Sequence, residues 1–300
     1  MADYIIGIDI GGTNFRIGAI TEDARILRHE IVSSRSYLTM ENPLEALCEQ
    51  IARFIQETPG TPRGCCMGFP GTVSKDKSTV FSCPNFPVFD GVNIRQTLEG
   101  KFGFPVIVEH EVLLLLTNDM QLYDLSQLDC VIGIYLGTGF GNAIYVHGRL
   151  LEGANGVSGE LGHIPVVGAD WVCPCGSVGC IEMISAGKRL EVIKNEHFPE
   201  ESTFEGVFAH GASNPVIAEY IDNIACAIAT EINILDPDRV ILGGGVINTP
   251  NFPYEALVDQ IRFRARKPYP SQTLQFIHPE KDSLQGIRGA GIYGWKHLEN

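Results

Sequence analysis

Residues 4–20 of this 300-residue chain read YIIGIDIGGTNFRIGAI, and this stretch decides the fold. Its apolar start predicts a buried strand, Gly11–Asn14 predict a tight turn, and its apolar end predicts a strand that runs back. The same design recurs over residues 131–146, where Gly137–Asn142 form the turn. Two hairpins of one kind, about one domain length apart, predict two related α/β halves that face a cleft.

Further helices and strands are expected around these hairpins. One helix is expected to begin at Pro43, because proline suits a first helical turn and apolar residues follow with helical spacing. The other expected elements are helices over Val112–Leu122, Pro215–Leu235, Phe252–Arg266 and Gly286–His297, and strands over Pro105–Val108 and Arg239–Leu242. We expect residues 1–118 plus 286–300 to form an N-terminal domain and residues 119–285 to form a C-terminal domain.

Composition narrows the class of protein. The chain is 44% hydrophobic and 19% charged, which is typical of a soluble globular protein. Its net charge of -14 argues against nucleic acid or an acidic membrane surface as a partner, but not against nucleotides held by backbone amides. No signal peptide or membrane-spanning run is expected, and nine cysteines, an odd number, suit a reducing compartment. These features together predict a cytoplasmic protein.

One imidazole and three thiols lie close together in the sequence: His163, Cys173, Cys175 and Cys180. They match a Cys3His zinc site. This ligand set is complete, so it predicts structural Zn²⁺ and leaves no position for the water of a zinc hydrolase.

Glycine-rich turns are candidate phosphate loops. They are the hairpin tips Gly11-Gly12-Thr13 and Gly137-Thr138-Gly139, and Gly243-Gly244-Gly245 after an expected strand. Either tip alone is more often a simple turn, whereas the three together favour nucleotide binding. None is a P-loop or a Rossmann fingerprint. Asp9, beside the first tip, is either a Mg²⁺-binding acid or a turn-capping residue.

Two acidic segments have both a functional and a structural interpretation. Glu109-His110-Glu111 stands before an expected helix, where a carboxylate either supports the helix N-terminus or acts as a general base. The loop Glu152–His163 is either a solvated acidic loop or a site whose carboxylates and imidazole bind sugar hydroxyls. The neighbouring cysteine cluster favours the second interpretation of this loop.

Three motifs together resemble the ROK family of sugar kinases and sugar-responsive repressors. They are Asp9-Ile10-Gly11-Gly12-Thr13, the Glu152–His163 loop and the segment Cys173–Glu182. The resemblance covers essentially the whole chain and implies the actin-like/hexokinase two-domain fold, a duplicated ribonuclease H-like architecture with a catalytic cleft. We expect no helix-turn-helix extension before Tyr4, so the kinase branch is the more similar one.

The resemblance implies ATP-dependent phosphorylation of the 6-hydroxyl of a hexose. D-allose is the favoured sugar, on the strength of Met67–Lys77, Pro84–Pro87 and Gly159–Pro165; glucose, mannose and N-acetylmannosamine are the alternatives. The implied cofactors are ATP, Mg²⁺ and structural Zn²⁺. A homo-oligomer is expected, with a dimer favoured.

The resemblance also implies roles for individual residues. Those expected at the sugar are Asn85, Glu152, Glu160 and His163, and those expected at ATP and Mg²⁺ are Asp9, Gly11, Gly12, Thr13, Gly137, Thr138, Gly139 and Gly244. Glu111 stands where the family has an aspartate as general base, and Leu113 stands where the family has an asparagine. Because the longer glutamate moves the carboxylate, a sugar-binding sensor that has lost catalysis is the alternative function.

Overall fold

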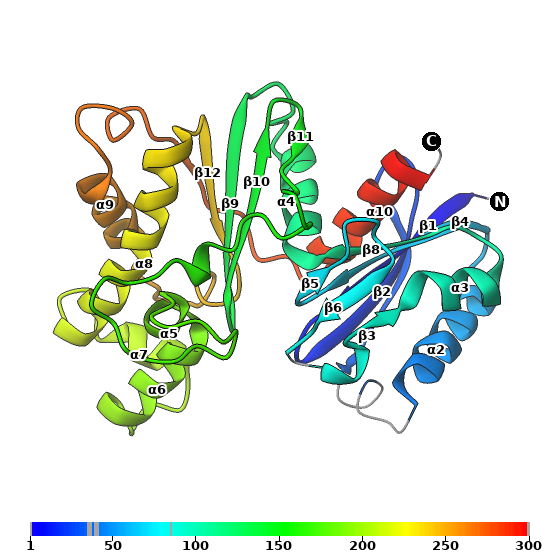
Figure 1. Cartoon of the computed structure of the whole chain (residues 1–300), viewed down its shortest axis with the longest axis horizontal. Coiled ribbons are helices and arrows are strands. Elements are labelled where there is room, and N and C mark those ends of the chain that lie inside the picture. The colour runs from blue at the N-terminus through cyan, green and yellow to red at the C-terminus, as the bar shows by residue number, and fades with distance from the viewer. Residues whose placement is uncertain (1, 35–37, 39–41, 85, 299–300) are drawn as a thin grey trace. The chain divides into compact units, whose positions relative to one another are not determined.

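The computed structural model describes residues 2–34, 38, 42–84 and 86–298, and the chain divides into two compact units (Figure 1). Unit 1 comprises Met1–Ser126, Glu152–Ser158 and Asp282–Asn300, and unit 2 comprises Gln127–Leu151 and Gly159–Lys281. The domain ranges expected from the sequence stay a prediction. Within the described residues, no helix has both the length and the apolar character needed to cross a membrane.

Unit 1 is built on a five-stranded sheet of order β3-β2-β1-β4-β8. These strands are β1 (Asp3–Ile10), β2 (Asn14–Ile20), β3 (Ile26–Ser33), β4 (Thr61–Phe69) and β8 (Val106–His110). β1, β2 and β3 pair antiparallel, whereas β4 pairs parallel to both β1 and β8. The first predicted hairpin is confirmed as β1–β2, and its register places Asp9 opposite Arg16.

Unit 2 repeats this pattern of directions in a second sheet, of order β11-β10-β9-β12-β13. The strands are β9 (Cys130–Leu136), β10 (Phe140–Val146), β11 (Arg149–Leu150), β12 (Arg239–Gly243) and β13 (Phe276–Ile277). β9, β10 and β11 are antiparallel, and β12 runs parallel to both β9 and β13. The matching order and directions confirm the predicted α/β class and its duplication.

Among the described residues, four α-helices belong to unit 1. They are α2 (Pro43–Glu57), α3 (Ile94–Phe102), α4 (Glu111–Leu122) and α10 (Gln285–Leu298). α10 packs on β1, β2, β4 and α4, so the end of the chain stabilises the central strands. Small strands β5 (Thr72–Val73), β6 (Thr79–Ser82) and β7 (Val92–Asn93) form a separate sheet, with the short helix η1 (Pro87–Phe89) between β6 and β7.

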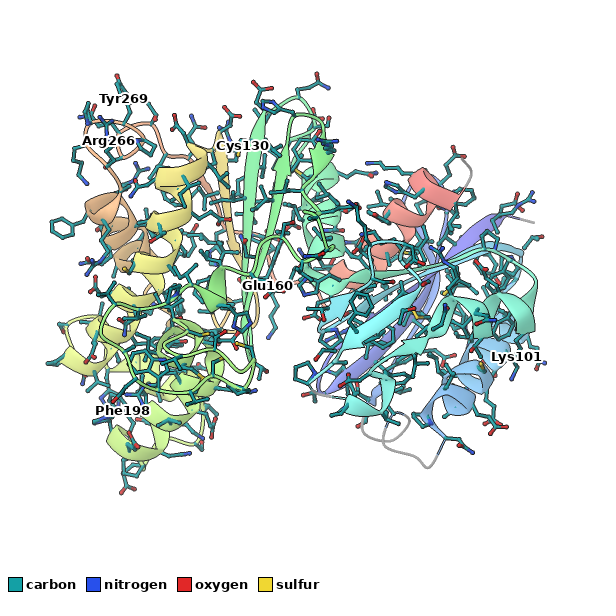
Figure 2. The ribbon with its side chains drawn as sticks, viewed as in Figure 1. Lys101, Cys130, Glu160, Phe198, Arg266 and Tyr269 are labelled. Atoms are coloured by element: carbon teal, nitrogen blue, oxygen red, sulfur yellow. The ribbon has the colours of Figure 1, made fainter. Side chains whose placement is uncertain are left out.

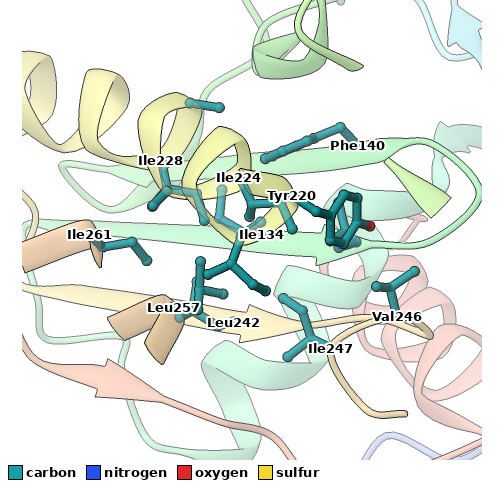
Figure 3. Packing of buried hydrophobic residues seen from close by; sticks show 14 of the residues in the cluster. Ile134, Phe140, Tyr220, Ile224, Ile228, Leu242, Val246, Ile247, Leu257 and Ile261 are labelled. Atoms are coloured by element: carbon teal, nitrogen blue, oxygen red, sulfur yellow. The ribbon is translucent and has the colours of Figure 1, made fainter. Parts of the chain in front are cut away.

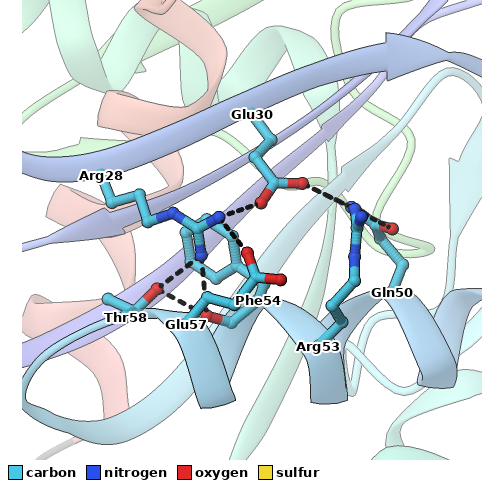
Figure 4. A network of polar contacts seen from close by, with 7 residues as sticks. All are labelled: Arg28, Glu30, Gln50, Arg53, Phe54, Glu57 and Thr58. Atoms are coloured by element: carbon cyan, nitrogen blue, oxygen red, sulfur yellow. Dashed lines mark hydrogen bonds and ion pairs between the residues drawn. The ribbon is translucent and has the colours of Figure 1, made fainter.

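Polar contacts fasten α2 to strand β3 (Figure 4). Glu30 accepts hydrogen bonds from Arg28 at 2.5 Å and from Arg53 at 2.8 Å, and Arg28 also pairs with Glu57. The Arg28 guanidinium lies over the Phe54 ring, 5.0 Å from its centre. These contacts lie at a partly exposed surface, so they fix the position of α2 more than they add to stability.

The core of unit 2 forms between its sheet and α8 (Pro215–Leu235) (Figure 3). Ile224 and Ile228 of this helix join the same buried cluster as Ile134 of β9 and Leu242 of β12. The predicted bounds of α8 are confirmed. The Asn214 side chain accepts a hydrogen bond from the backbone N–H of Val216 at the start, and Asp236 turns left-handed at the end.

The remaining helices of unit 2 are short. They are η2 (Leu161–His163), α5 (Glu182–Ser185), α6 (Gly187–His197), α7 (Phe204–Ala209) and α9 (Tyr254–Arg264). The helix expected over Phe252–Arg266 is shorter than predicted at both ends. Pro253 occupies its N-cap position outside helical geometry, and Ala265 adopts an extended conformation.

Candidate functional site

An ion pair between Asp9 and Arg16 lies next to the glycine loop of unit 1, Gly11-Gly12-Thr13. Arg16 donates a hydrogen bond to Asp9 at 3.0 Å across the β1–β2 hairpin, and both side chains are largely buried. Burial raises the pKa of Asp9, and Arg16 offsets part of this effect. Asp9 is thus held by a cation within a strand, which is not the turn-capping arrangement.

Ser34 holds the loop itself in place. Its hydroxyl donates to the carbonyl of Gly11 at 2.6 Å, and its backbone N–H donates to the carbonyl of Thr13 at 2.9 Å. Gly12 and Thr13 are exposed at the tip. The expected phosphate-binding residues Gly11, Gly12 and Thr13 therefore form one ordered, accessible loop beside Asp9.

Glu111 is the first residue of α4, directly after β8. Burial raises the pKa of Glu111 to about 8, the carboxylate of Asp9 adds to the rise, and Arg16 opposes it. The two acids are therefore electrostatically coupled, with Arg16 acting on both. A carboxyl whose pKa lies near neutral pH is suited to exchange a proton with a ligand. Leu113, two residues further along α4, is buried.

The turn before Glu111 is tighter than the sequence suggests, because Glu109 and His110 belong to strand β8. Glu109 is 1% exposed, and its Oε1 accepts the backbone N–H of His110 at 2.8 Å. Burial lowers the pKa of His110 to about 4, and the Lys77 ammonium adds to this effect. His110 is therefore neutral at physiological pH.

Of the sugar-binding residues expected in unit 1, the structure describes Glu152. Glu152 forms an ion pair with Lys77, with 3.1 Å between Oε1 and Nζ, and its side chain is 36% exposed. Asn85 lies outside the described residues.

The glycine loop of unit 2 is tied to the start of α6. The backbone N–H groups of Gly187 and Lys188 donate to the carbonyls of Gly137 and Thr138 at 2.9 and 3.2 Å. Thr138 is exposed at the tip, and Gly137 and Gly139 flank it. Backbone hydrogen bonds therefore hold this loop at α6, whereas the loop of unit 1 lies beside the Asp9–Arg16 pair.

Gly244 lies beside that loop because β12 runs parallel to β9. Its φ of +94° is in the left-handed region, and a side chain there would collide with the backbone of Leu136. The N–H of Val246 donates to the Leu136 carbonyl at 2.8 Å. The expected ATP-binding residues Gly137, Thr138, Gly139 and Gly244 thus gather at one edge of the second sheet.

The Cys/His cluster assembles as expected. The ligand atoms of His163, Cys173, Cys175 and Cys180 all lie within 4.8 Å of one another. The Sγ atoms of Cys175 and Cys180 are 3.7 Å apart, and Zn–S bonds of about 2.3 Å in a tetrahedron require about 3.8 Å. Two soft thiolates at this spacing, with a third thiolate and an imidazole, fit a structural zinc ion.

The two nitrogens of His163 have different neighbours. Nδ1 lies 3.8 Å from Cys173 Sγ, and Nε2 lies 3.5 Å from Glu160 Oε2. One ring thus lies between the thiol cluster and Glu160, which directly precedes η2 and is labelled in Figure 2. Burial raises the pKa of Glu160, with His163 opposing and Glu182 reinforcing the change.

Three residues with roles in these arrangements were not singled out from the sequence. Arg16 pairs with Asp9, and Lys77 pairs with Glu152. Glu182 accepts the backbone N–H of Phe140 at 2.8 Å, directly after the loop Gly137–Gly139. The signal for Arg16 was available, because hairpin register places it opposite Asp9. Lys77 is 75 positions from Glu152, and no local pattern links the two.

Two units built on one sheet pattern, each with a glycine-rich hairpin loop, define a hexokinase-like α/β protein. The chain matches the ROK family over residues 5–294. The glucokinase of Thermotoga maritima is 28% identical over 263 residues, which cover 81% of this chain and 82% of the relative. The N-acetyl-D-glucosamine kinase of Vibrio vulnificus is 27% identical over 309 residues, which cover 97% and 99%.

A solved structure agrees with these matches. A ROK family glucokinase from Streptomyces griseus in complex with glucose and AMPPNP superposes with a TM-score of 0.80 at 25% identity, covering 96% of this chain and 98% of that one. The chain therefore belongs to the ROK family, and the relatives described above, which it matches over most of their length, are sugar kinases.

Proposed function

We propose that the protein is an ATP-dependent hexose kinase that phosphorylates the 6-hydroxyl of D-allose. The observation that supports it most is Glu111, a half-buried carboxyl whose pKa burial raises to about 8, with the carboxylate of Asp9 adding to the rise. General bases work best when their pKa lies near the working pH. Sugar phosphorylation needs such a group to take the hydroxyl proton, while phosphoryl transfer itself depends on positioning and charge stabilisation.

In the proposed reaction Glu111 accepts the proton of the sugar 6-hydroxyl. The hydroxyl oxygen forms a bond to the γ-phosphorus, the bond from that phosphorus to the bridging oxygen breaks, and ADP leaves with the electron pair. Asp9 would hold Mg²⁺, directly or through water, and Mg²⁺ when bound supplies charge neutralisation at the phosphates. Arg16 would restrain Asp9 in the orientation that faces the metal.

The phosphate contacts are assigned to two backbone loops. Gly11, Gly12 and Thr13 in unit 1, and Gly137, Thr138, Gly139 and Gly244 in unit 2, would present N–H groups and hydroxyls to ATP. The relative bound to AMPPNP, an ATP analogue, supports the choice of nucleotide.

The sugar contacts are assigned to acids and an imidazole. Glu160 and His163 would bind sugar hydroxyls, with Glu152 and Asn85 as further contacts. Zn²⁺ held by His163, Cys173, Cys175 and Cys180 would fix the His163 ring and, through it, the carboxylate of Glu160. The metal has a structural role in this proposal and takes no part in the transfer.

The identity of the sugar is the most specific part of the proposal. D-allose rests on the resemblance of residues 67–77, 84–87 and 159–165 to the matching segments of allose-specific members of the family. The relatives named glucokinase and N-acetyl-D-glucosamine kinase instead support glucose or an N-acetylated hexosamine.

A coupled assay for ADP release tests both levels of the proposal. The purified protein with ATP and Mg²⁺ is given D-allose, D-glucose, D-mannose, N-acetylmannosamine and N-acetylglucosamine in turn. We expect the highest kcat/KM with D-allose. A higher value for another sugar replaces D-allose and keeps the kinase. Sugar binding by calorimetry without ADP release, even at high protein concentration, supports the sensor and contradicts the kinase.

A further inference from the structure

Lys77 lies where three parts of unit 1 meet. It belongs to the β5–β6 hairpin, where its backbone is left-handed with a φ of 60°. Its ammonium is 2.7 Å from Glu109 Oε2 and 3.1 Å from Glu152 Oε1, and its side chain is only 13% exposed. One buried cation therefore serves two carboxylates from distant segments of the chain.

The first of these carboxylates reaches the turn that presents Glu111. The other oxygen of Glu109 accepts the backbone N–H of His110, the residue directly before Glu111. The backbone carbonyl of Lys77 also accepts the N–H of Val108 at 3.0 Å. Lys77 thus contacts β8 through both its backbone and its side chain, within two residues of the turn.

The second carboxylate opens the segment Glu152–Ser158. The carbonyl of Glu152 accepts the N–H of Ser158 at 3.3 Å, which closes the segment into a loop. Gly156 lies so near the β5–β6 hairpin that an added Cβ would be 3.1 Å from the Val73 carbonyl oxygen. The loop therefore packs on the hairpin that contains Lys77, and the ion pair fixes its first residue.

The Lys77 ammonium stays charged, which maintains its ion pairs with Glu109 and Glu152. Burial alone lowers the pKa of Lys77, but the carboxylates of Glu109 and Glu152 outweigh it and raise the pKa above its ordinary value. The ammonium therefore stays charged throughout the physiological range. Removal of the cation leaves Glu109 buried without its counter-charge, which is strongly unfavourable.

We propose that Lys77 is a positioning residue that couples the turn before Glu111 to the Glu152–Ser158 loop. Its effect on turnover rests on the proposed kinase function, whereas its effect on the two segments does not. Lys75 is the matched control, because it is a lysine of the same hairpin with an exposed side chain and lies outside the ion-pair group of Lys77.

The test compares Lys77→Met, Lys75→Met and wild type by hydrogen exchange and by steady-state kinetics. In Lys77→Met we expect faster exchange at residues 108–112 and 152–158. We also expect a fall in kcat of about 10- to 100-fold and a raised KM for the sugar, with the KM for ATP unchanged. Lys75→Met should match wild type in every measurement. Lys77→Met that matches Lys75→Met in exchange and in kinetics overturns the proposal.

Two further variants keep the test decisive. If Lys77→Met does not fold, the double variant Lys77→Met/Glu109→Gln removes the unpaired buried charge and is measured in its place, with the same expected and contradicting results. Glu152→Gln should speed hydrogen exchange at residues 152–158, and its effect on that exchange should add little when it is combined with Lys77→Met, because both break one contact. Additive effects contradict the coupling. If wild type phosphorylates none of the sugars, the kinase proposal fails, and the exchange of the two segments still decides the role of Lys77.

Discussion

The hairpin β1–β2 of unit 1 and the hairpin β9–β10 of unit 2 occupy the same place in two matching sheets, yet they differ in chemistry. At the second-last position of the first strand, unit 1 pairs Asp9 with Arg16, whereas unit 2 pairs Tyr135 with Gly141. The glycine-rich tips are retained in both. Duplication therefore explains two backbone loops suited to phosphates, while among the described residues unit 1 alone combines its loop with the Asp9–Arg16 pair and the half-buried Glu111.

Each unit also contains a glutamate whose pKa burial raises to about 8. Glu111 lies beside Asp9 at the start of α4, whereas Glu231 lies within α8, where the Asn142 side chain donates to it at 3.0 Å. A raised pKa by itself thus does not identify a functional acid. What distinguishes Glu111 is its coupling to Asp9 and Arg16 next to the exposed loop.

The largest expected effect is on kcat, which should fall when Glu111 is replaced and stay nearly unchanged when Glu231 is replaced. Glu111→Gln should lower kcat by about 10²- to 10⁴-fold with sugar affinity roughly retained, because an amide cannot accept the hydroxyl proton. Glu231→Gln, with an equally shifted carboxyl in the other unit, should keep kcat within a few-fold of wild type. Turnover and calorimetry of both variants check this. Full activity in Glu111→Gln removes it as the base.

The same two variants should behave alike in stability. Between the unfolded pKa of 4.5 and the folded pKa of about 8, the folded protein retains a proton that the unfolded chain releases. The raised pKa therefore lowers the free energy of unfolding as pH rises through this range. Glutamine does not titrate and so removes this loss. Relative to wild type, the free energy of unfolding of each variant should therefore rise by roughly 2–4 kcal/mol as the pH goes from 4.5 to 8. Denaturant unfolding of variant and wild type at pH 4.5 and pH 8 measures this difference in the free energy of unfolding. A difference that does not grow with pH contradicts the raised pKa of the glutamate.

Among the described residues, a group of Cys and His side chains able to hold a metal ion occurs in unit 2 alone, which adds a second difference between the units. Cys175→Ser should lower the zinc content and raise the sugar KM by about 10- to 100-fold, because His163 and Glu160 lose their support. Cys226→Ser changes a half-buried free cysteine of the same unit outside the cluster and should retain the metal. Metal analysis and kinetics compare the two; unchanged zinc in Cys175→Ser contradicts the ligand set.

The smallest expected effect concerns the backbone of the second loop. Gly244→Ala should lower the free energy of unfolding by about 1–3 kcal/mol and raise the KM for ATP, because alanine is strained at a φ of +94° and meets Leu136. At Gly245 an added Cβ meets nothing within 4 Å, so Gly245→Ala is the control. Denaturant unfolding and ATP titrations compare Gly244→Ala with Gly245→Ala. If the two variants have the same free energy of unfolding and the same KM for ATP, the strained contact at Gly244 is contradicted.

The sequence predicted the features that depend on local pattern. The hairpins β1–β2 and β9–β10, the bounds of α8 and the four residues of the Cys/His cluster all follow from short-range spacing, and the structure confirms them. The turn expected over Gly137–Asn142 is shorter than predicted, because β10 already begins at Phe140. The zinc ion and the individual roles of the site residues stay predictions.

Other features depend on tertiary contacts and had no local signal. Lys77 meets Glu152 only because the β5–β6 hairpin packs against a loop 75 residues away. The pKa of Glu111 depends on burial and on Asp9 from another strand, neither of which periodicity reveals. The ends of α9 lie inside the predicted range because Pro253 and Ala265 lie outside helical geometry.

The pH dependence of kcat/KM for sugar phosphorylation tests the central claim, that Glu111 of unit 1 is the base. Wild type and Glu231→Gln should both show kcat/KM rising about tenfold per pH unit below an apparent pKa near 8 and levelling above it, since the base acts only when deprotonated. Glu111→Gln should lose this rise along with its activity. A profile that is flat from pH 6 to 9 in wild type, or one that Glu231→Gln abolishes while Glu111→Gln retains it, contradicts the account.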